Sequence, residues 1–276
     1  MIEDFGINFG GKILAEAWML AAHKDGSSII VNGEYAGKTL REYLGYENFP
    51  ILIKFIDAQD NLSVQVHPAD DYAQKFENQL GKHEFWYILD AAPDAFIYRG
   101  LNRVVTKEEF AERIKENTLE EILQKVPVKK GESFFIPAGT IHSVGKGILL
   151  AEVQQNSNVS YRIYDYGRKR TLHIEKALDV ADLKPFDYDE KNYPHLVSCK
   201  YFTVDKINLD GKISARLEGN VNENFLSILI LDGQGKISVG EETLNYAKGE
   251  SFFIPANSGH WAIEGTCEAL LTTLGR

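Results

Sequence analysis

Short apolar segments rich in Val, Ile and aromatic residues recur along the whole chain, with polar stretches between them. Their length and β-branched composition are typical of strands, and they lack the longer 3.6-residue period of amphipathic helices. Asp-Gly pairs at positions 25, 210 and 232 predict turns, because Gly accepts the positive φ of tight hairpins. The pattern therefore predicts a mainly β protein. Its expected strands are 51–56, 62–66, 85–89, 134–136, 148–153, 227–231, 251–254 and 269–273.

The sequence Gly-Glu-Ser-Phe-Phe-Ile-Pro-Ala occurs twice, at 131–138 and at 249–256, and a histidine follows each copy. These histidines, His142 and His260, are 118 residues apart. Upstream, the apolar segments that end at Leu89 and Leu231 are 142 residues apart, so the first copy contains 24 additional residues. A repeat of this kind predicts a duplicated β fold with an insertion in copy one.

The insertion is predicted to be helical. Two capping-box patterns, Thr106 with Glu109 and Thr118 with Glu121, each precede an amphipathic stretch. We expect a helical insertion around 101–126 and a further short helix over 70–79. The expected domains are an N-terminal catalytic domain, 1–175, and a C-terminal domain, 176–276.

Candidate metal ligands are found in copy one. Strand side chains alternate between faces, so residues 63, 65 and 67 share one face and residues 82, 84 and 86 share another. If both faces point into one barrel, Gln65, His67 and Glu84 converge, and His142 joins them from the turn after Pro137. Two imidazoles and a carboxylate suit zinc, iron or manganese.

These residues occur within recognisable motifs. The spacing Gly131-x5-Pro137-x-Gly139-x2-His142 matches the second cupin motif, and Gln65-x-His67 followed by Glu84 resembles the first, with Gln in place of its leading His. The stretches 50–68, 81–87, 137–142 and 154–168 closely resemble type I mannose-6-phosphate isomerase in its short form. The resemblance extends from about residue 10 to the C-terminus. It implies two cupin (jelly-roll) β-barrels, the first with the helical insertion and the second degenerate.

The resemblance also implies a cofactor and a reaction. It implies one Zn²⁺ per chain on Gln65, His67, Glu84 and His142. The implied activity interconverts mannose 6-phosphate and fructose 6-phosphate through an enediol(ate) by proton transfer, which needs one proton moved between adjacent carbons.

Further roles follow from matching positions in the family. Lys54 and Ser63 match residues near the substrate phosphate, and both residue types bind phosphate. Arg162 matches the active-site arginine, and Lys82 or Glu152 would transfer the proton if burial shifts its pKa. The sequence leaves open which of the two is the base.

Copy two lacks most of this chemistry. Its counterpart of Glu84 is Leu226, and no Gln-x-His or His-x-His precedes that position. We therefore expect a structural, metal-free second copy, with His260 lacking partner ligands.

Charge and composition limit the classes of molecule that the protein is expected to bind. The net charge of −10 argues against nucleic acid and anionic membranes, so an anionic sugar phosphate would need a local basic pocket. The N-terminus lacks a basic region followed by an apolar stretch, and the chain has two cysteines, so we expect a cytoplasmic protein. A monomer and a homodimer are both compatible with the sequence.

Two other functions remain open at this stage. An iron-dependent cupin dioxygenase would use the same two histidines and carboxylate, with coordination positions left for oxygen. A non-catalytic sugar-phosphate-binding cupin would bind the substrate on the same barrel without isomerising it.

Overall fold

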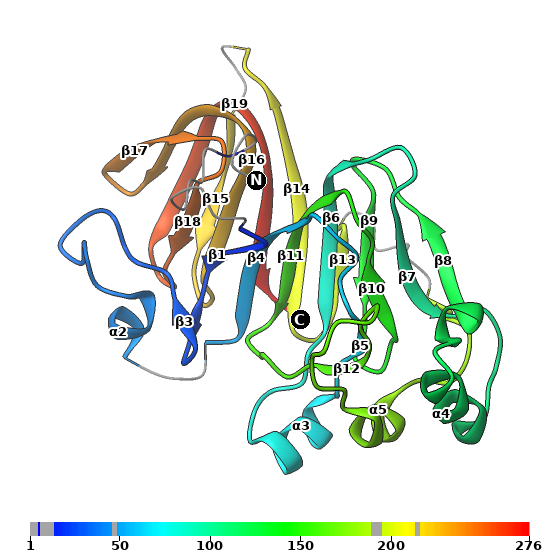
Figure 1. The fold of residues 1–276 in the computed structure, drawn as a ribbon. Coiled ribbons are helices and arrows are strands. Elements are labelled where there is room, and N and C mark those ends of the chain that lie inside the picture. The colour runs from blue at the N-terminus through cyan, green and yellow to red at the C-terminus, as the bar shows by residue number, and fades with distance from the viewer. Residues whose placement is uncertain (1–4, 6–13, 46–48, 189–194, 213–215, 276) are drawn as a thin grey trace. The chain divides into compact units, whose positions relative to one another are not determined.

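The structure is a computed structural model that describes residues 5, 14–45, 49–188, 195–212 and 216–275. The chain forms two compact units, each described here by itself. The first-copy unit comprises residues 15–17 and 54–189, and the second-copy unit comprises 1–14, 18–53 and 190–276, each within its described residues. The units are discontinuous in sequence, since 18–53 group with the C-terminal strands, and the boundary at residue 175 stays a prediction. Both units are mainly β, as expected (Figure 1).

The strands of the first-copy unit lie in two five-stranded sheets. Two strands of the first sheet, β1 (Glu16–Leu20) and β4 (Ile51–Ala58), contribute to this unit only residues 16–17 and 54–58. Strand pairs with a printed register are antiparallel, and the strand order mixes distant segments, so ligands remote in sequence become neighbours. The first sheet has the order β1, β4, β11 (Ile148–Gln155), β6 (Glu84–Ala91) and β9 (Ser133–Ile136). The second has the order β12 (Tyr161–Tyr164), β5 (Val64–Val66), β10 (His142–Val144), β7 (Phe96–Leu101) and β8 (Leu123–Pro127).

Three α-helices of the first-copy unit lie at one end of its strands, at the lower right of Figure 1: α3 (Asp70–Glu77), α4 (Lys107–Lys115) and α5 (Ile174–Val180). The predicted helix at 70–79 is thus confirmed. The N-cap half of the first capping box is also confirmed, because the Thr106 side chain accepts a hydrogen bond from the Glu109 amide, whereas the Glu109 side chain pairs with Arg103. Phe110 and Ile114 bury the apolar face of α4 against the core.

The prediction of a second capping box in the insertion is wrong. Thr118 is not in the extended conformation of an N-cap, and its side chain caps nothing (φ −109°, ψ 16°). A single 3₁₀ turn, η1 (Leu119–Ile122), follows, and β8 begins at Leu123. The insertion therefore contributes one helix, one turn and a sheet-edge strand.

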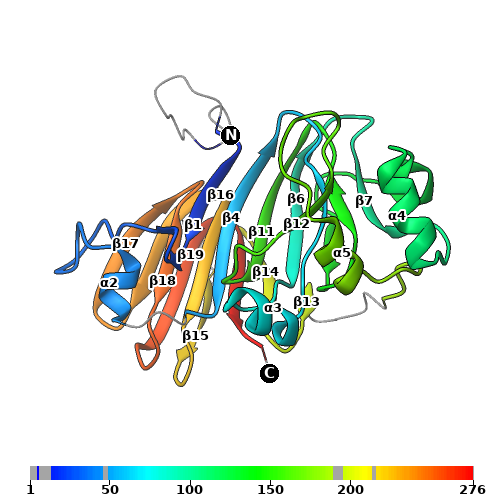
Figure 2. The ribbon, with the colours of Figure 1, turned by 60° about the horizontal axis from the view of Figure 1, so that its bottom comes forward.

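The second-copy unit is built around a third sheet, in which the long strands β14, β19 and β16 run side by side (Figure 2). Its order is β13 (Val197–Ser198), β14 (Phe202–Asp210), β19 (Gly259–Leu274), β16 (Leu226–Val239) and β17 (Glu242–Ala247). Off this path, β15 (Arg216–Val221) pairs with β19 and β18 (Ser251–Ile254) pairs with β16. The hairpin of β2 (Ala22–His23) and β3 (Gly26–Ser27) and the helix α2 (Leu40–Leu44) complete the unit.

The turn expected at Asp232-Gly233 is also wrong. Strand β16 continues through these residues, and its register against β19 shifts between Ile230 and Asp232. Gly233 has a positive φ of 98° and approaches the Thr266 backbone so closely that a Cβ would lie 2.1 Å from its carbonyl oxygen. Gly233 therefore lies at a β-bulge within the strand, and its positive φ does not mark a hairpin turn. The pair at 25–26 does lie at the β2–β3 hairpin, and the pair at 210–211 ends β14.

An apolar core fills part of the first-copy unit. Ile88, Ile97 and Leu150 are fully buried in one cluster, and Trp86 belongs to the same cluster. Among the described residues, none of the helices is long and apolar enough to cross a membrane.

Candidate metal centre and active site

Register across the second sheet places three site residues in one row. His142 of β10 pairs with Gln65 of β5, and Gln65 pairs on its other side with Arg162 of β12. Directly paired residues project to the same face, so these three side chains share one side of the sheet. In the first sheet, Glu152 of β11 pairs with Trp86 of β6, two residues from Glu84. The site residues thus come from both sheets of the first-copy unit.

His67, Glu84 and His142 form a compact buried cluster. His67 Nε2 lies 3.1 Å from Glu84 Oε1, and His142 Nε2 lies 3.5 Å from Glu84 Oε2. The ligand atoms of the three residues all lie within 4.8 Å of one another. Each side chain is only 1% exposed, so water hardly competes for these donor atoms.

Backbone carbonyls orient both imidazoles. His67 Nδ1 donates to the Val159 carbonyl at 3.0 Å, and His142 Nδ1 donates to the Thr140 carbonyl at 2.8 Å. A proton held on Nδ1 leaves the lone pair of Nε2 toward Glu84, which is the usual arrangement of a metal-binding histidine. The turn before His142 depends on Gly139, whose φ is 88° and whose amide donates to the His67 carbonyl.

The charge states of the cluster suit a cation. Burial, followed by the nearby Lys82 ammonium, lowers the pKa of His67 to about 3, and burial also lowers the pKa of His142, so both imidazoles stay neutral. Burial alone would raise the pKa of Glu84, but Lys82, whose Nζ is 2.6 Å from Oε1, holds it well below its usual value. Glu84 is therefore an ionised carboxylate.

Gln65 lies beside the cluster, as expected. Its Nε2 is 3.5 Å from His142 Nε2, and its Oε1 accepts a 2.7 Å hydrogen bond from the Ser160 hydroxyl. Ser160 is a site residue that the sequence analysis missed, because its position on this face depends on how β12 pairs with β5.

The donors fit a divalent cation. Two neutral imidazole nitrogens face one ionised carboxylate, and neither carboxylate oxygen accepts a hydrogen bond of good geometry, although Lys82 is close. The Lys82 ammonium compensates part of the cost of burying the Glu84 charge, and a bound cation would compensate more of it. Imidazole and carboxylate ligands suit zinc, iron or manganese.

A second buried carboxylate, Glu152, lies next to the metal cluster. Its Oε2 accepts a 2.9 Å hydrogen bond from Trp86 Nε1, and its Oε1 is 3.3 Å from Lys54 Nζ. Burial, with a further contribution from Glu84, raises the pKa of Glu152 despite the neighbouring lysines. Trp86 also presents its ring edge-on to His142 at 5.4 Å, so one side chain contacts both parts of the site.

Lys54 and Ser63, the two expected phosphate ligands, have different neighbours. Lys54 is 5% exposed and lies near Glu152 and Glu16, whereas Ser63 accepts a hydrogen bond from Arg162 Nε at 3.3 Å. Lys54 therefore has two carboxylates close by. A joint role of Lys54 and Ser63 at the phosphate stays a prediction.

Two arginines that the sequence analysis did not single out lie near Arg162. Arg168 and Arg170 both pair with the buried Asp165, and both add positive potential at the Arg162 guanidinium. Their signal was present in the sequence as Arg168-Lys-Arg170, four residues beyond Tyr164.

Two further histidines are not part of the cluster. His83 bonds through Nδ1 to Gln155 at 2.9 Å. His260 of the second-copy unit has a side chain 51% exposed and lies 3.5 Å from Glu218. The metal-free character of copy two stays a prediction.

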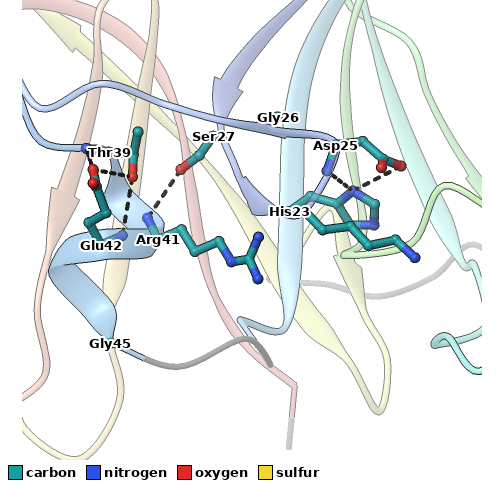
Figure 3. A pocket seen from close by; sticks show the side chains of 9 residues that line it. His23, Asp25, Gly26, Ser27, Thr39, Arg41, Glu42 and Gly45 are labelled. Carbon is teal, nitrogen blue, oxygen red and sulfur yellow. Dashed lines mark hydrogen bonds and ion pairs between the residues drawn. The ribbon is translucent and has the colours of Figure 1, made fainter.

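A surface hollow of about 590 Å³ lies in the second-copy unit between the β2–β3 hairpin and α2 (Figure 3). His23, Asp25 and Arg41 line it, and the Thr39–Glu42 capping box closes one side. Its lining includes none of the predicted site residues, and acidic and basic groups are mixed in it. The buried cluster in the first-copy unit is therefore the stronger candidate for chemistry.

Comparison with known proteins gives concordant matches. The family model for the phosphomannose isomerase type I catalytic domain matches residues 10–96, and that for the mannose-6-phosphate isomerase cupin domain matches 192–274. Mannose-6-phosphate isomerase ManA of Bacillus subtilis is 38% identical, over 99% of this chain and 93% of its own. Mannose-6-phosphate isomerase of Streptococcus mutans is 36% identical, over 97% and 91%.

The crystal structure of mannose 6-phosphate isomerase from Bacillus subtilis superposes with a TM-score of 0.89 at 33% identity. That match covers 98% of this chain and 93% of the other. Sequence similarity over nearly the full length and the shared fold lead to one conclusion: this chain, with its cupin domain over 192–274, belongs to the type I phosphomannose isomerase family.

Proposed function

We propose that this protein is a mannose-6-phosphate isomerase that interconverts mannose 6-phosphate and fructose 6-phosphate with one Zn²⁺ per chain. The names of its relatives support the reaction. The observation that supports a metal enzyme most strongly is the convergence of His67 Nε2 and His142 Nε2 on the Glu84 carboxylate. These residues and Gln65 would hold the ion.

The ion, when bound, would act as a Lewis acid that polarises a sugar oxygen and stabilises developing negative charge. With one carboxylate among its ligands, the site keeps a net charge near +1 for that task.

Isomerisation requires a group that moves a proton between adjacent carbons. Glu152 suits this role because a raised pKa brings a carboxyl group closer to neutral pH, where it can both accept and donate a proton. Trp86 fixes the orientation of the carboxylate through its 2.9 Å hydrogen bond. Lys82, next to Glu84, is the second candidate for proton transfer or for stabilising charge on the substrate.

The substrate phosphate needs positive charge in a protein whose net charge is −10. Arg162, bonded to Ser63, supplies a guanidinium and a hydroxyl at one place, and both groups donate to phosphate oxygens. Lys54 would contribute by neutralising Glu152 or by contacting the substrate directly. Cytoplasmic location, the absence of a nucleic-acid or membrane partner, and a monomeric or homodimeric state remain predictions.

The test is a coupled isomerase assay on the zinc-loaded protein beside Gln65→Ala and His142→Ala. We expect both variants to lose activity. His260→Ala is the matched control, because it removes the equivalent histidine of copy two and should leave activity unchanged. Full activity in both ligand variants would overturn the site assignment.

The two other functions give different results. Oxygen consumption by an iron-loaded sample, without isomerase activity, would indicate a dioxygenase. Binding of mannose 6-phosphate without hydrogen exchange at its C2 would indicate a non-catalytic sugar-phosphate-binding protein.

A further inference from the structure

We propose that Ser160 is a positioning residue for the metal site: its hydroxyl bonds the outer end of the Gln65 amide and holds that amide beside His67, Glu84 and His142, so that Oε1 can bind a cation. The proposal rests on the metal-binding role given to Gln65 under the proposed function. It assigns to Ser160 an effect on metal affinity, and no contact with substrate.

Residues 159 and 160 together support two of the proposed ligands. The Val159 carbonyl accepts from His67 Nδ1, and the Ser160 hydroxyl donates to Gln65 Oε1 at 2.7 Å. This segment directly precedes β12, whose Tyr161 pairs with Val66 between the two ligands. The shorter contact of His67 is with the main chain, with the Ser160 hydroxyl farther away at 3.4 Å from Nδ1, whereas the support of Gln65 requires the serine side chain.

A glutamine amide has two ends of nearly equal size and opposite chemistry. Only Oε1 can bind a cation, while Nε2 carries two hydrogens and repels one. In the structure Oε1 faces Ser160 and Nε2 faces His142 Nε2 at 3.5 Å, an orientation that binds no cation. Rotation of the amide by about 180° exchanges the ends in place, so the two orientations differ mainly in their hydrogen-bond partners.

A serine hydroxyl is a suitable partner in both orientations because it donates and accepts. Without a cation it donates to Oε1, as the structure has it. With a cation it would accept from Nε2 and leave Oε1 directed at the ion. In the described part of the chain, Ser160 and His142 are the side chains that Gln65 contacts through hydrogen bonds. Removal of the hydroxyl therefore leaves the outward amide nitrogen without its side-chain partner.

The experiment measures the zinc dissociation constant by competition with a chromophoric chelator, without substrate. Ser160→Ala should weaken zinc binding by about tenfold, since loss of an outer partner of a ligand typically costs 10–100-fold in affinity. Ser160→Thr keeps the hydroxyl and should retain most of the affinity. The matched control is Ser157→Ala, because the Ser157 hydroxyl in the same segment donates to the Leu80 carbonyl and to no proposed ligand.

A double-mutant cycle separates positioning from a general structural role. In a Gln65→Ala background there is no amide to hold, so Ser160→Ala should have a much smaller effect on zinc affinity, limited to the longer 3.4 Å contact of its hydroxyl with His67 Nδ1. Unchanged affinity of Ser160→Ala, or an equal loss in both backgrounds, would overturn the proposal. If thermal unfolding shows that the alanine variant is not folded, Ser160→Gly replaces it, since it also lacks the hydroxyl, and wild-type zinc affinity in that variant would overturn the proposal.

The zinc measurement and the isomerase assay fail independently. Tight zinc binding by the wild type without isomerase activity would overturn the proposed function and leave the role of Ser160 standing. If the wild type is active and Ser160→Ala leaves zinc affinity unchanged, the proposed function stands and the proposed role of Ser160 is overturned.

Discussion

The two copies of the repeat have the same strand register and different chemistry. In copy one, Glu84 pairs with Ile136 and the following residues pair in sequence with β9. In copy two, Leu226 pairs with Ile254 and the pairing with β18 continues in the same way. The offsets of 142 and 118 residues found in the sequence are thus offsets between equivalent positions in paired strands.

The difference between the copies lies in a few side chains on this shared frame. Copy two has Leu226 where copy one has Glu84. In the β16–β19 pair of copy two, Leu271 is opposite Ile228, and at the equivalent place in the β6–β11 pair of copy one, Glu152 is opposite Trp86. The turn histidines also differ in environment, with side chains 1% and 51% exposed. The repeated motif therefore specifies a strand and a turn, and the ligands on neighbouring strands determine whether that turn serves a metal site.

The largest effect should come from replacing the turn histidine of copy one, His142, and not its counterpart in copy two, His260. His142→Ala removes a proposed ligand and should lower kcat/KM by roughly 10³-fold or more, since the metal contributes several kcal/mol of charge stabilisation. His260→Ala should leave kcat/KM and zinc content unchanged. Steady-state kinetics and metal analysis of the two variants test this prediction. Loss of activity in both would contradict the difference in role between the two copies.

Glu152→Gln tests the second polar position that copy two lacks. The amide still accepts from Trp86 Nε1 but cannot take up a proton, so kcat should fall by about 10²-fold, the lower end of the general acid–base contribution. Zinc affinity should change little, because Glu152 is not a proposed ligand. Wild-type kcat in this variant would remove Glu152 as the proton carrier and favour Lys82.

Ile88 and Ile230 occupy equivalent positions, and both are fully buried. Either Ile→Ala substitution should lower the free energy of unfolding by about 2–5 kcal/mol, through lost burial and the resulting cavity. Ile88 packs in the same cluster as Trp86, so only Ile88→Ala should also reduce activity at temperatures where both variants are folded. Urea titration gives the stabilities, and equal activity losses would contradict a purely structural second copy.

The smallest effect concerns pH and the metal-free protein. The pKa of His67 is about 3 in the folded state and near 6.5 when unfolded, so between these values the unfolded chain binds a proton that the folded chain does not. Stability should therefore fall as pH decreases from 6.5 toward 3, by at most about 1.4 kcal/mol per pH unit for this group. The raised pKa of Glu152 acts in the opposite direction above its unfolded value.

Urea unfolding of the chelator-treated protein at pH 7 and pH 5 measures this slope. His67→Gln should flatten it, whereas His260→Ala should leave it unchanged. An unchanged slope in His67→Gln would show that other groups dominate the pH dependence.

Much of the fold and of the metal cluster was predictable from the sequence. The strand segments, the α4 cap and the convergence of His67, Glu84 and His142 followed from periodicity and motif spacing. The errors arose where one local pattern is compatible with two structures. Asp232-Gly233 is suited to a turn or to a bulge, and pairing with β19 decided for the bulge.

The sequence by itself determined the duplication, the mainly β class and the ligand types, because these depend on residue identity and on spacing within single strands. The tertiary structure alone decided which partners each site residue meets: Lys54 near Glu152, Arg162 on Ser63 and Ser160 on Gln65. The physical reason is that strand periodicity specifies the face of a side chain but not the strand beside it or the sheet opposite it. Those neighbours determine the charge of Glu84, the raised pKa of Glu152 and the orientation of the Gln65 amide.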